Sequence, residues 1–249
     1  AGLAFYSQAQ LALRHADDAI LAAREARLSG HVSVGMAPST ASVLGVPFIN
    51  AMRESYPDVR LHLVESLSGN LERMINTRQL DLAIVFQQEK ILRWSARPVL
   101  EERLFLIGTH ALLASLPDDP VSPDQLTTLP LIMPSQGHGL RGRLETVCQQ
   151  HNLSVEVVAD IDGLALLMQA VRSGLGATLQ PGAAISHLDH QALRVIGIAN
   201  PVLSRPNFLV SLSDDELTPA GLAARVILSK VMRQLVGSDR WPGATLYVN

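Results

Sequence analysis

Residues 30–65, GHVSVGMAPSTASVLGVPFINAMRESYPDVRLHLVE, decide the fold of this chain. Apolar residues alternate with polar or small ones over 32–34 and again over 59–63, which predicts two strands. The segment between them predicts a helix for which Ser39 or Thr40 would be the N-cap. Ligands of open α/β sheets bind beyond the carboxyl ends of the strands. The Ser39-Thr40 turn is therefore a candidate ligand-binding position.

The same pattern continues along the chain. An apolar run over 82–86 predicts a strand buried on both faces, which completes a βαβαβ series with parallel strands. A second α/β series starts near residue 100, and the last helix, opened by Thr218 and Pro219, is predicted to pack back on the first series. The predicted fold class is α/β, with two Rossmann-like subdomains joined by two crossover strands. We expect the domains to be residues 31–102 with 210–237, residues 103–209, and a tail without strong pattern over 238–249.

The first 28 residues predict one helix that precedes these subdomains. Apolar or small residues recur there in alternating steps of three and four, at Tyr6, Ala9, Leu13, Ala16, Ile20 and Ala23. Such a narrow apolar seam favours a helix that pairs with another helix in a dimer. The alternative is an ordinary amphipathic helix that lies on its own domain.

Composition limits the class of protein. The chain has 249 residues, 47% of them hydrophobic, and a formal net charge of −3, so it is globular and has no overall basic field for nucleic acid. Cys148 is the only cysteine, which fits a reducing compartment. No apolar run approaches the roughly 18 residues of a membrane span, and residues 1–20 lack the pattern of a secretory signal. Because the sequence starts in helix-like residues without Met, we expect that upstream residues have been removed.

One motif suggests a nucleotide-binding enzyme. Residues 137–142, GHGLRG, fit G-x-G-x-x-G, and Asp160 follows at about the offset of a ribose-binding acid. However, residues 134–136 separate the preceding strand from the first glycine, and this unit belongs to the second half of the chain. The simpler hypothesis is a helix-entry loop whose N–H groups would still favour an anion.

Other candidate sites are weaker. The His187–His190 segment has donors close together, but a surface helix end is the better interpretation than a metal site. Cys148 lies in a predicted helix, where burial is a better interpretation than a nucleophilic role. No G-x-S-x-G elbow and no phosphate loop occur in the sequence. We therefore expect no cofactor and no metal.

Hydroxyl-bearing turns recur at the predicted strand ends. They are Ser39-Thr40, Ser66 with Ser68, and Pro134-Ser135-Gln136, and Gln180-Pro181 ends a further strand. Helix capping explains each turn taken alone, whereas their recurrence favours a shared ligand cleft. Hydroxyls and free helix N–H groups suit a small anion such as a carboxylate or sulfonate.

Several short motifs, in this order and spacing, resemble the carboxyl-terminal part of a LysR-type transcriptional regulator. They are GHVSVG at 30–35, PST at 38–40, Pro47-Phe48 with Tyr56-Pro57, QLDLA at 79–83, ERLFLIG at 102–108, and VRSGLG at 171–176 with Pro181. The resemblance extends from the first helix to about Leu235. The PST turn and the strand at 104–109 are most similar to the branch of nitrogen- and sulfur-assimilation regulators.

The resemblance implies a fold like that of type II periplasmic binding proteins, preceded by a long linker helix that pairs in dimers. It implies that the DNA-binding domain of the family is absent from this chain and that DNA is a partner only through that domain. The implied effector contacts are Ser39, Thr40, Ser68, Phe86, Pro134, Ser135, Gln136, Ile161, Gln180 and Pro181. Phe86 stands where some relatives have a charged contact.

The predicted function is therefore an effector-sensing regulatory domain that binds a small, anionic molecule in the cleft between its subdomains. We expect a cytoplasmic protein that is not an enzyme, forms a dimer or tetramer, and has no membrane partner. Two alternatives stay open at this point. One is a solute-binding protein for transport, although an export signal is absent from this sequence, and the other is a nucleotide-dependent enzyme that uses residues 137–142.

Overall fold

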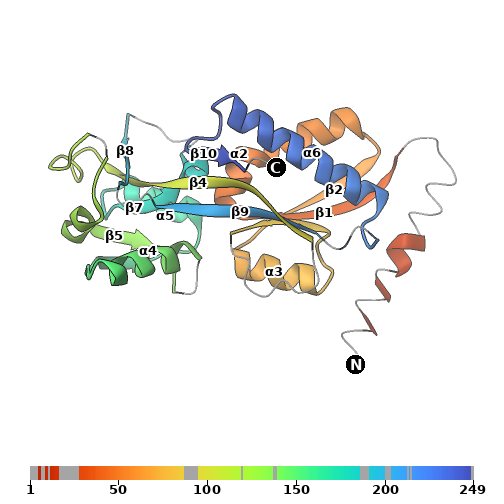
Figure 1. Cartoon of the computed structure of the whole chain (residues 1–249), viewed down its shortest axis with the longest axis horizontal. Coiled ribbons are helices and arrows are strands. Elements are labelled where there is room, and N and C mark those ends of the chain that lie inside the picture. The colour runs from red at the N-terminus through yellow and green to blue at the C-terminus, as the bar shows by residue number, and fades with distance from the viewer. Residues whose placement is uncertain are drawn as a thin grey trace. The chain divides into compact units, whose positions relative to one another are not determined.

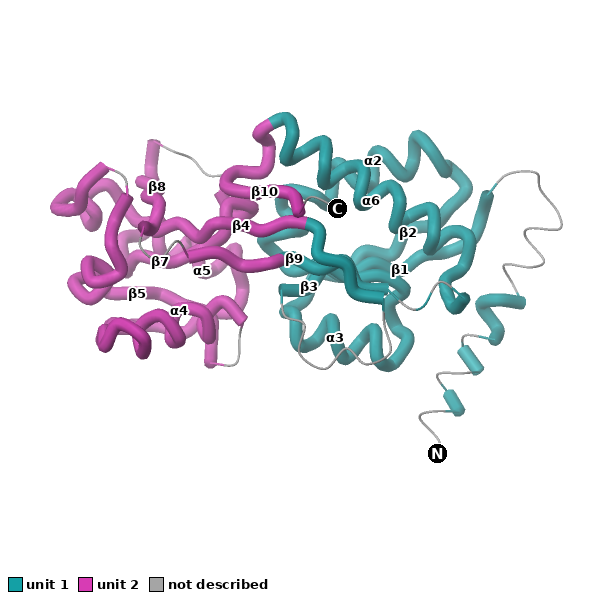
Figure 2. Tube along the Cα trace, in the orientation of Figure 1, with its two compact units in different colours: residues 1–99, 207–238 teal, residues 100–206, 239–249 magenta. Residues whose placement is uncertain are grey.

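The chain folds into two compact α/β units (Figure 2). Unit 1 comprises residues 1–99 and 207–238, and unit 2 comprises residues 100–206 and 239–249. The structure is a computed structural model that describes residues 5–6, 9–10, 12–16, 28–86, 95–118, 120–136, 139–185, 191–199, 203–211, 213 and 215–247. None of the helices among these residues has an apolar stretch of membrane-spanning length. The predicted α/β class with two structural series is confirmed.

The sheet of unit 1 is built around β1 (Gly30–Met36). Strand β2 (Val59–Glu65) pairs with β1 in parallel, from Gly30 opposite Val59 to Met36 opposite Glu65. Strand β3 (Leu82–Val85) lies parallel on the other side, with Val34 opposite Leu82. The second half of β9 (Ser204–Ser211) pairs antiparallel with β3. The carboxyl ends of β2, β1 and β3 consequently meet at one edge of the sheet.

Helices cover both faces of this sheet (Figure 1). Helices α2 (Pro38–Ser55) and α6 (Pro219–Gly237) pack together on one face, and α3 (Ser68–Asn76) packs on the other. A Cβ on Gly35 would lie 2.7 Å from a methyl carbon of Leu71, so glycine lets α3 approach β1 closely. The predicted packing of the last helix on the first series is confirmed, and Thr218 caps it by accepting from the Gly221 N–H at 3.1 Å.

Unit 2 places a helix on each side of its strands. The residues of β4 (Ser95–Thr109) that lie in this unit pair antiparallel with β7 (Thr178–Pro181) and β8 (Leu193–Gly197), while β5 (Pro130–Met133) and β6 (Glu156–Asp160) pair in parallel. Alternate residues of β5 face different cores. Leu131 packs with α4 (Gly139–Gln150), and Ile132 packs with α5 (Leu164–Arg172). Two short 3₁₀ helices, η1 (Pro123–Thr128) and η2 (Gly182–Ala184), connect these elements.

The carboxyl-terminal segment has structure that the sequence pattern did not predict. Strand β10 (Ala244–Leu246) pairs antiparallel with residues 100–102 of β4. Trp241 is 1% exposed, and its indole N–H donates to Glu102 Oε1 at 2.6 Å. This segment belongs to unit 2, whereas the helix before it belongs to unit 1.

Strand β4 starts at Ser95 and continues for fifteen residues, without a break, through the strand at 104–109 that the sequence indicates. The predicted helix over 1–28 lies mostly outside the described residues. The residues of it that are described as helical are 5–6, 9–10 and 12–16.

Candidate ligand-binding site

Four predicted site residues lie at the carboxyl ends of the parallel strands of unit 1. Ser39 and Thr40 are in the first turn of α2, which follows β1, and Ser68 is the first residue of α3, which follows β2. Phe86 directly follows β3. Because these strands are adjacent and parallel, the structure brings the four residues to one edge of the sheet.

The prediction that Ser39 or Thr40 caps α2 was wrong. Ala37 is the N-cap, and Pro38 occupies the first helical position, so the two hydroxyl residues fall inside the first turn. Helix α3 similarly starts after Leu67. Neither N-cap residue supplies a side-chain hydrogen bond, and neither first turn contains an acidic residue. Both helix starts therefore keep the partial positive charge that attracts anions.

Two hydroxyls in this group are buried and have no hydrogen-bond partner among the described residues. The Thr40 residue is 0% exposed and Ser68 is 9% exposed. Neither Thr40 Oγ1 nor Ser68 Oγ makes a hydrogen bond within the described part of the chain. A buried hydroxyl without a partner costs about 1–3 kcal/mol, so each is a position where a ligand atom would restore a lost interaction. Phe86, which is also buried, adds apolar surface and no charge.

The other six predicted residues lie at strand ends of unit 2. Residues 134–136 follow β5, Ile161 follows β6, and Gln180 with Pro181 ends β7. The Ile161 N–H donates to Met133 O at 2.8 Å, and the residue before β7, Ala177, accepts from the Ile132 N–H at 2.7 Å. The three strands are mutually parallel, so these residues share one edge of their sheet.

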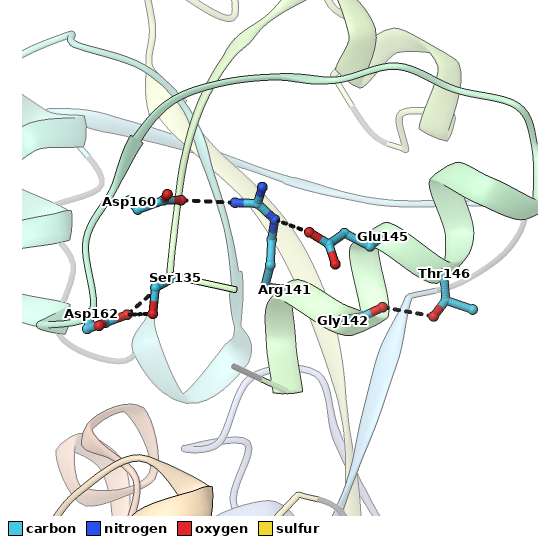
Figure 3. Close-up of polar contacts among 7 residues, drawn as sticks. All are labelled: Ser135, Arg141, Gly142, Glu145, Thr146, Asp160 and Asp162. Atoms are coloured by element: carbon cyan, nitrogen blue, oxygen red, sulfur yellow. Dashed lines mark hydrogen bonds and ion pairs between the residues drawn. The ribbon is translucent and has the colours of Figure 1, made fainter. Parts of the chain in front are cut away.

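Two polar side chains of this second set, those of Ser135 and Gln180, already have partners in the protein. The N–H and the hydroxyl of Ser135 both donate to Asp162 Oδ1, at 2.9 and 2.8 Å (Figure 3). The buried Gln180 donates from Nε2 to Thr178 Oγ1 at 3.4 Å. Sequence reasoning did not find Asp162, because no motif marks it and its contact with Ser135 spans 27 residues.

The residues of the glycine-rich motif do not support dinucleotide binding. Gly137 and His138 lie outside the described residues, and Gly139 to Gly142 form the first turn of α4. Arg141 donates from Nε to Glu145 at 2.8 Å and from Nη1 to Asp160 at 3.1 Å (Figure 3). Asp160, the acid that the ribose hypothesis requires, is thus paired with a cation in the same motif.

Metal and nucleophile chemistry have little support. The segment from His187 to His190 lies outside the described residues. Across the described ranges, no group of three or more His, Cys, Asp or Glu side chains could hold a metal ion. Cys148 is buried as predicted, and burial, followed by the charge of Glu145, raises the pKa of its thiol. A raised thiol pKa disfavours the reactive thiolate.

A cavity of about 740 Å³ lies elsewhere in unit 1, at the amino-terminal half of β1 and β2. Its lining includes Arg14, His31, Arg60 and His62, and none of the ten predicted site residues lines it. Arg14 reaches this place from the amino-terminal segment and forms an ion pair with Asp81 at 3.1 Å. The sequence signal was the alternation of polar residues along one face of the two strands, at 31, 33, 60 and 62.

The family model described as "LysR substrate binding domain" matches residues 25–233. The nitrogen assimilation regulatory protein nac of Escherichia coli is 29% identical over 251 residues, which cover 96% of this chain and 79% of that protein. Its namesake in Klebsiella aerogenes is 29% identical, with coverage of 94% and 77%.

Solved structures share the fold at low identity. A full-length OxyR variant of Pseudomonas aeruginosa superposes with a TM-score of 0.77 at 18% identity, covering all of this chain and 79% of that one. The regulatory domain of CcmR from Synechocystis, in complex with 2-PG, gives 0.73 at 17% identity, with coverage of 82% and 98%. The effector-binding domain of QuiR, in complex with shikimate, gives 0.71 at 17%, with coverage of 83% and 98%. The predicted arrangement of two subdomains, as in type II periplasmic binding proteins, is confirmed at the level of the fold.

Proposed function

Because the chain belongs to the LysR substrate-binding-domain family, we propose that it is the effector-sensing regulatory domain of a LysR-type transcriptional regulator. It binds a small molecule and has no enzymatic activity of its own. It acts in the cytoplasm, and it contacts DNA through a domain outside residues 1–249. A ligand controls such a regulator only by binding one of its states more tightly than the other.

The observation that carries the proposal is the pair of buried hydroxyls on Thr40 and Ser68. They belong to two different helices, each of which begins where one of two adjacent parallel strands ends. Two unsatisfied hydroxyls at such a place are costly for folding alone and useful for binding. A small molecule that hydrogen-bonds to both would remove this cost.

The start of α2 and the start of α3 support an anionic ligand. Their first turns contain no acidic residue and no side-chain cap, so their N–H groups favour a negative group. A carboxylate or sulfonate would also accept from the two hydroxyls. The solved complexes of QuiR with shikimate and of CcmR with 2-PG support a small-molecule effector for this family fold.

The proposed effector contacts are Ser39, Thr40, Ser68 and Phe86 in unit 1, and Pro134, Ser135, Gln136, Ile161, Gln180 and Pro181 in unit 2. Unit 1 supplies the unsatisfied hydroxyls and the helix starts. Unit 2 supplies one further hydroxyl, two amide side chains and apolar surface.

A thermal-shift screen with small carboxylates, sulfonates and nitrogen or sulfur metabolites tests the proposal. A ligand should raise the Tm of the wild type and not that of a Thr40→Val, Ser68→Ala double variant. Thr146→Val is the matched control, because the Thr146 hydroxyl donates to Gly142 O in α4, outside the proposed contacts (Figure 3). Equal Tm increases in wild type and double variant would remove the hydroxyls from the site. A screen in which no compound stabilises the wild type would contradict the effector itself.

We also propose that residues 1–28 mediate self-association into a dimer or tetramer. The apolar seam of this segment supports the proposal. Light scattering of the full chain and of a variant lacking residues 1–28 should give different masses. The same monomeric mass for both would contradict the role of this segment.

A further inference from the structure

A carboxylate of the protein occupies the turn that the proposed site takes from unit 2. Asp162 Oδ1 accepts from both the N–H and the hydroxyl of Ser135, at 2.9 and 2.8 Å (Figure 3). A backbone N–H and a hydroxyl that converge on one oxygen are the contacts that an anionic ligand would receive in the same turn. In the structure these two donors are therefore already directed to an internal anion.

The nearby cation of the glycine-rich motif is also engaged by carboxylates of the protein. Arg141 donates to Glu145 and to Asp160 (Figure 3). An incoming anion would have to replace Asp162 at Ser135.

A ligand could replace Asp162 at Ser135 without disturbing the core of unit 2. Both hydrogen bonds between Ser135 and Asp162 are exposed to solvent. Asp162 lies in the short loop between β6 and α5, and the backbone of its neighbour Ile161 is fixed separately by the hydrogen bond to Met133. Rotation of the Asp162 side chain would release the Ser135 donors while the strand ends stay in place.

We propose that Asp162 is an internal competitor of the effector, a specificity-determining residue that keeps small oxyanions out of the Ser135 turn until a ligand displaces it. This inference rests on the proposed function. It restricts effectors to molecules whose other contacts with the protein are strong enough to compensate for the displacement. A simple oxyanion without such contacts is excluded from this turn.

Sulfate binding tests the inference. Sulfate replaces chloride stepwise at constant ionic strength, and the NMR signal of the Ser135 amide reports its binding and gives the Kd. Asp162→Ala should bind sulfate about tenfold more tightly than the wild type, because the competing charged hydrogen bonds are gone. The Ser135 amide resonance of the Asp162→Ala variant should shift as the variant becomes saturated with sulfate. Asp160→Ala is the matched control. It removes an equal charge two residues from Asp162, but from a carboxylate that pairs with Arg141 and not with Ser135. Equal gains in both variants would show a general charge effect and overturn the inference.

Two further variants separate the possible failures. Ser135→Ala introduced into Asp162→Ala should abolish the gain, and a gain that survives would place the sulfate elsewhere. Asp162→Asn keeps the shape of the side chain, so an intermediate gain is expected even if the alanine variant folds poorly, and no gain would overturn the inference. The Thr40→Val, Ser68→Ala variant tests unit 1 alone. Its failure to alter the ligand response would remove the two hydroxyls from the proposed site and leave the Asp162 result standing, whereas a screen without any stabilising compound would contradict the proposed function.

Discussion

Arg205 and Glu102 form an ion pair in the interior of unit 2. Arg205 Nη2 lies 2.8 Å from Glu102 Oε2, and the two side chains are 5% and 0% exposed. The other carboxylate oxygen, Oε1, accepts from the Trp241 indole at 2.6 Å and from the Ala183 N–H at 3.2 Å. Burial lowers the pKa of Arg205, and the charge of Glu102 partly offsets this effect. One buried carboxylate thus joins β4, β9, η2 and the carboxyl-terminal segment.

Replacing Glu102 by Gln should destabilise the protein strongly. Glutamine preserves the shape of the side chain but removes the negative charge that Glu102 places against the buried Arg205 guanidinium. Removing one partner of a buried pair typically costs about 3–5 kcal/mol. We expect a decrease of that size in the free energy of unfolding, measured by urea denaturation.

The control is the double variant Glu102→Gln, Arg205→Met. Because the buried guanidinium is also gone, the double variant should recover much of the loss, since apolar replacements of buried pairs are often near neutral. A loss of less than about 1 kcal/mol in the single variant would mean that the pair behaves like one on the surface.

Gly182→Ala should displace the carboxyl-terminal segment. A Cβ at this position would lie 1.5 Å from Pro242 O, which no side-chain rotation can relieve. The segment around Trp241 should then leave β4, and its indole should become exposed. The measurement is the fluorescence of Trp241 in a Trp94→Phe background, which should shift to longer wavelength. Gly163→Ala is the control, because a Cβ there has no atom within 4 Å. Unchanged emission of the Gly182 variant would contradict the close packing.

The sequence predicts the parts of the fold that depend on neighbouring residues. The strands predicted from alternation over 32–34 and 59–63 and the capping by Thr218 depend on local sequence, and the structure confirms them. Strand β10 was not predicted, because its three residues carry too little pattern and its anchor joins Trp241 to a residue 139 positions away.

For the candidate site, too, the sequence predicts the features that depend on neighbouring residues. The positions of Ser39, Thr40 and Ser68 at strand ends follow from the order of strands and helices. The assignment of Ser39 or Thr40 as N-cap failed because Pro38 takes the first helical position and moves the cap to Ala37. The burial of the Thr40 hydroxyl and the contact of Ser135 with Asp162 depend on tertiary packing, which no local pattern encodes.

Thr40→Val should stabilise the ligand-free protein while it weakens ligand binding. Valine has nearly the same shape, and it removes a buried hydroxyl that makes no hydrogen bond within the described residues. The expected gain is about 1 kcal/mol, or roughly 2–4 °C in Tm for a chain of this size. Differential scanning calorimetry without ligand measures it. A loss of stability would mean that the hydroxyl has a partner in the folded state and would weaken the case for a ligand at this position.

His31 should make stability depend on pH below neutrality. Burial is the main cause that lowers the pKa of His31 from 6.5, and the positive charge of Arg14 adds to it, whereas Asp81 opposes it. The unfolded chain then binds the proton more readily than the folded chain, so stability is complete above pH 6.5. It should decrease as pH falls from 6.5 towards the folded-state pKa and stay constant below it. His31→Gln should flatten this part of the curve in urea denaturation at a series of pH values. The same slope in the variant would assign the effect to other groups.

The ion pair of Arg14 with Asp81 should couple the amino-terminal segment to the sheet of unit 1. Asp81 is 6% exposed, and its second oxygen accepts from the Ser33 N–H at 2.7 Å, while Arg14 also donates to Arg78 O at 2.9 Å. These contacts lie at the connection between α3 and β3, whose other ends carry Ser68 and Phe86.

A double-mutant cycle with Arg14→Ala and Asp81→Asn measures this coupling by urea denaturation. We expect an interaction energy of about 1 kcal/mol, because the pair is partly buried and screened less than a surface pair. Arg73→Ala with Asn70→Ala, an exposed pair within α3 with a donor–acceptor distance of 3.2 Å, is the control cycle and should give less than about 0.5 kcal/mol. Equal energies in the two cycles would mean that Arg14 does not fix the amino-terminal segment to the elements that carry the proposed effector contacts.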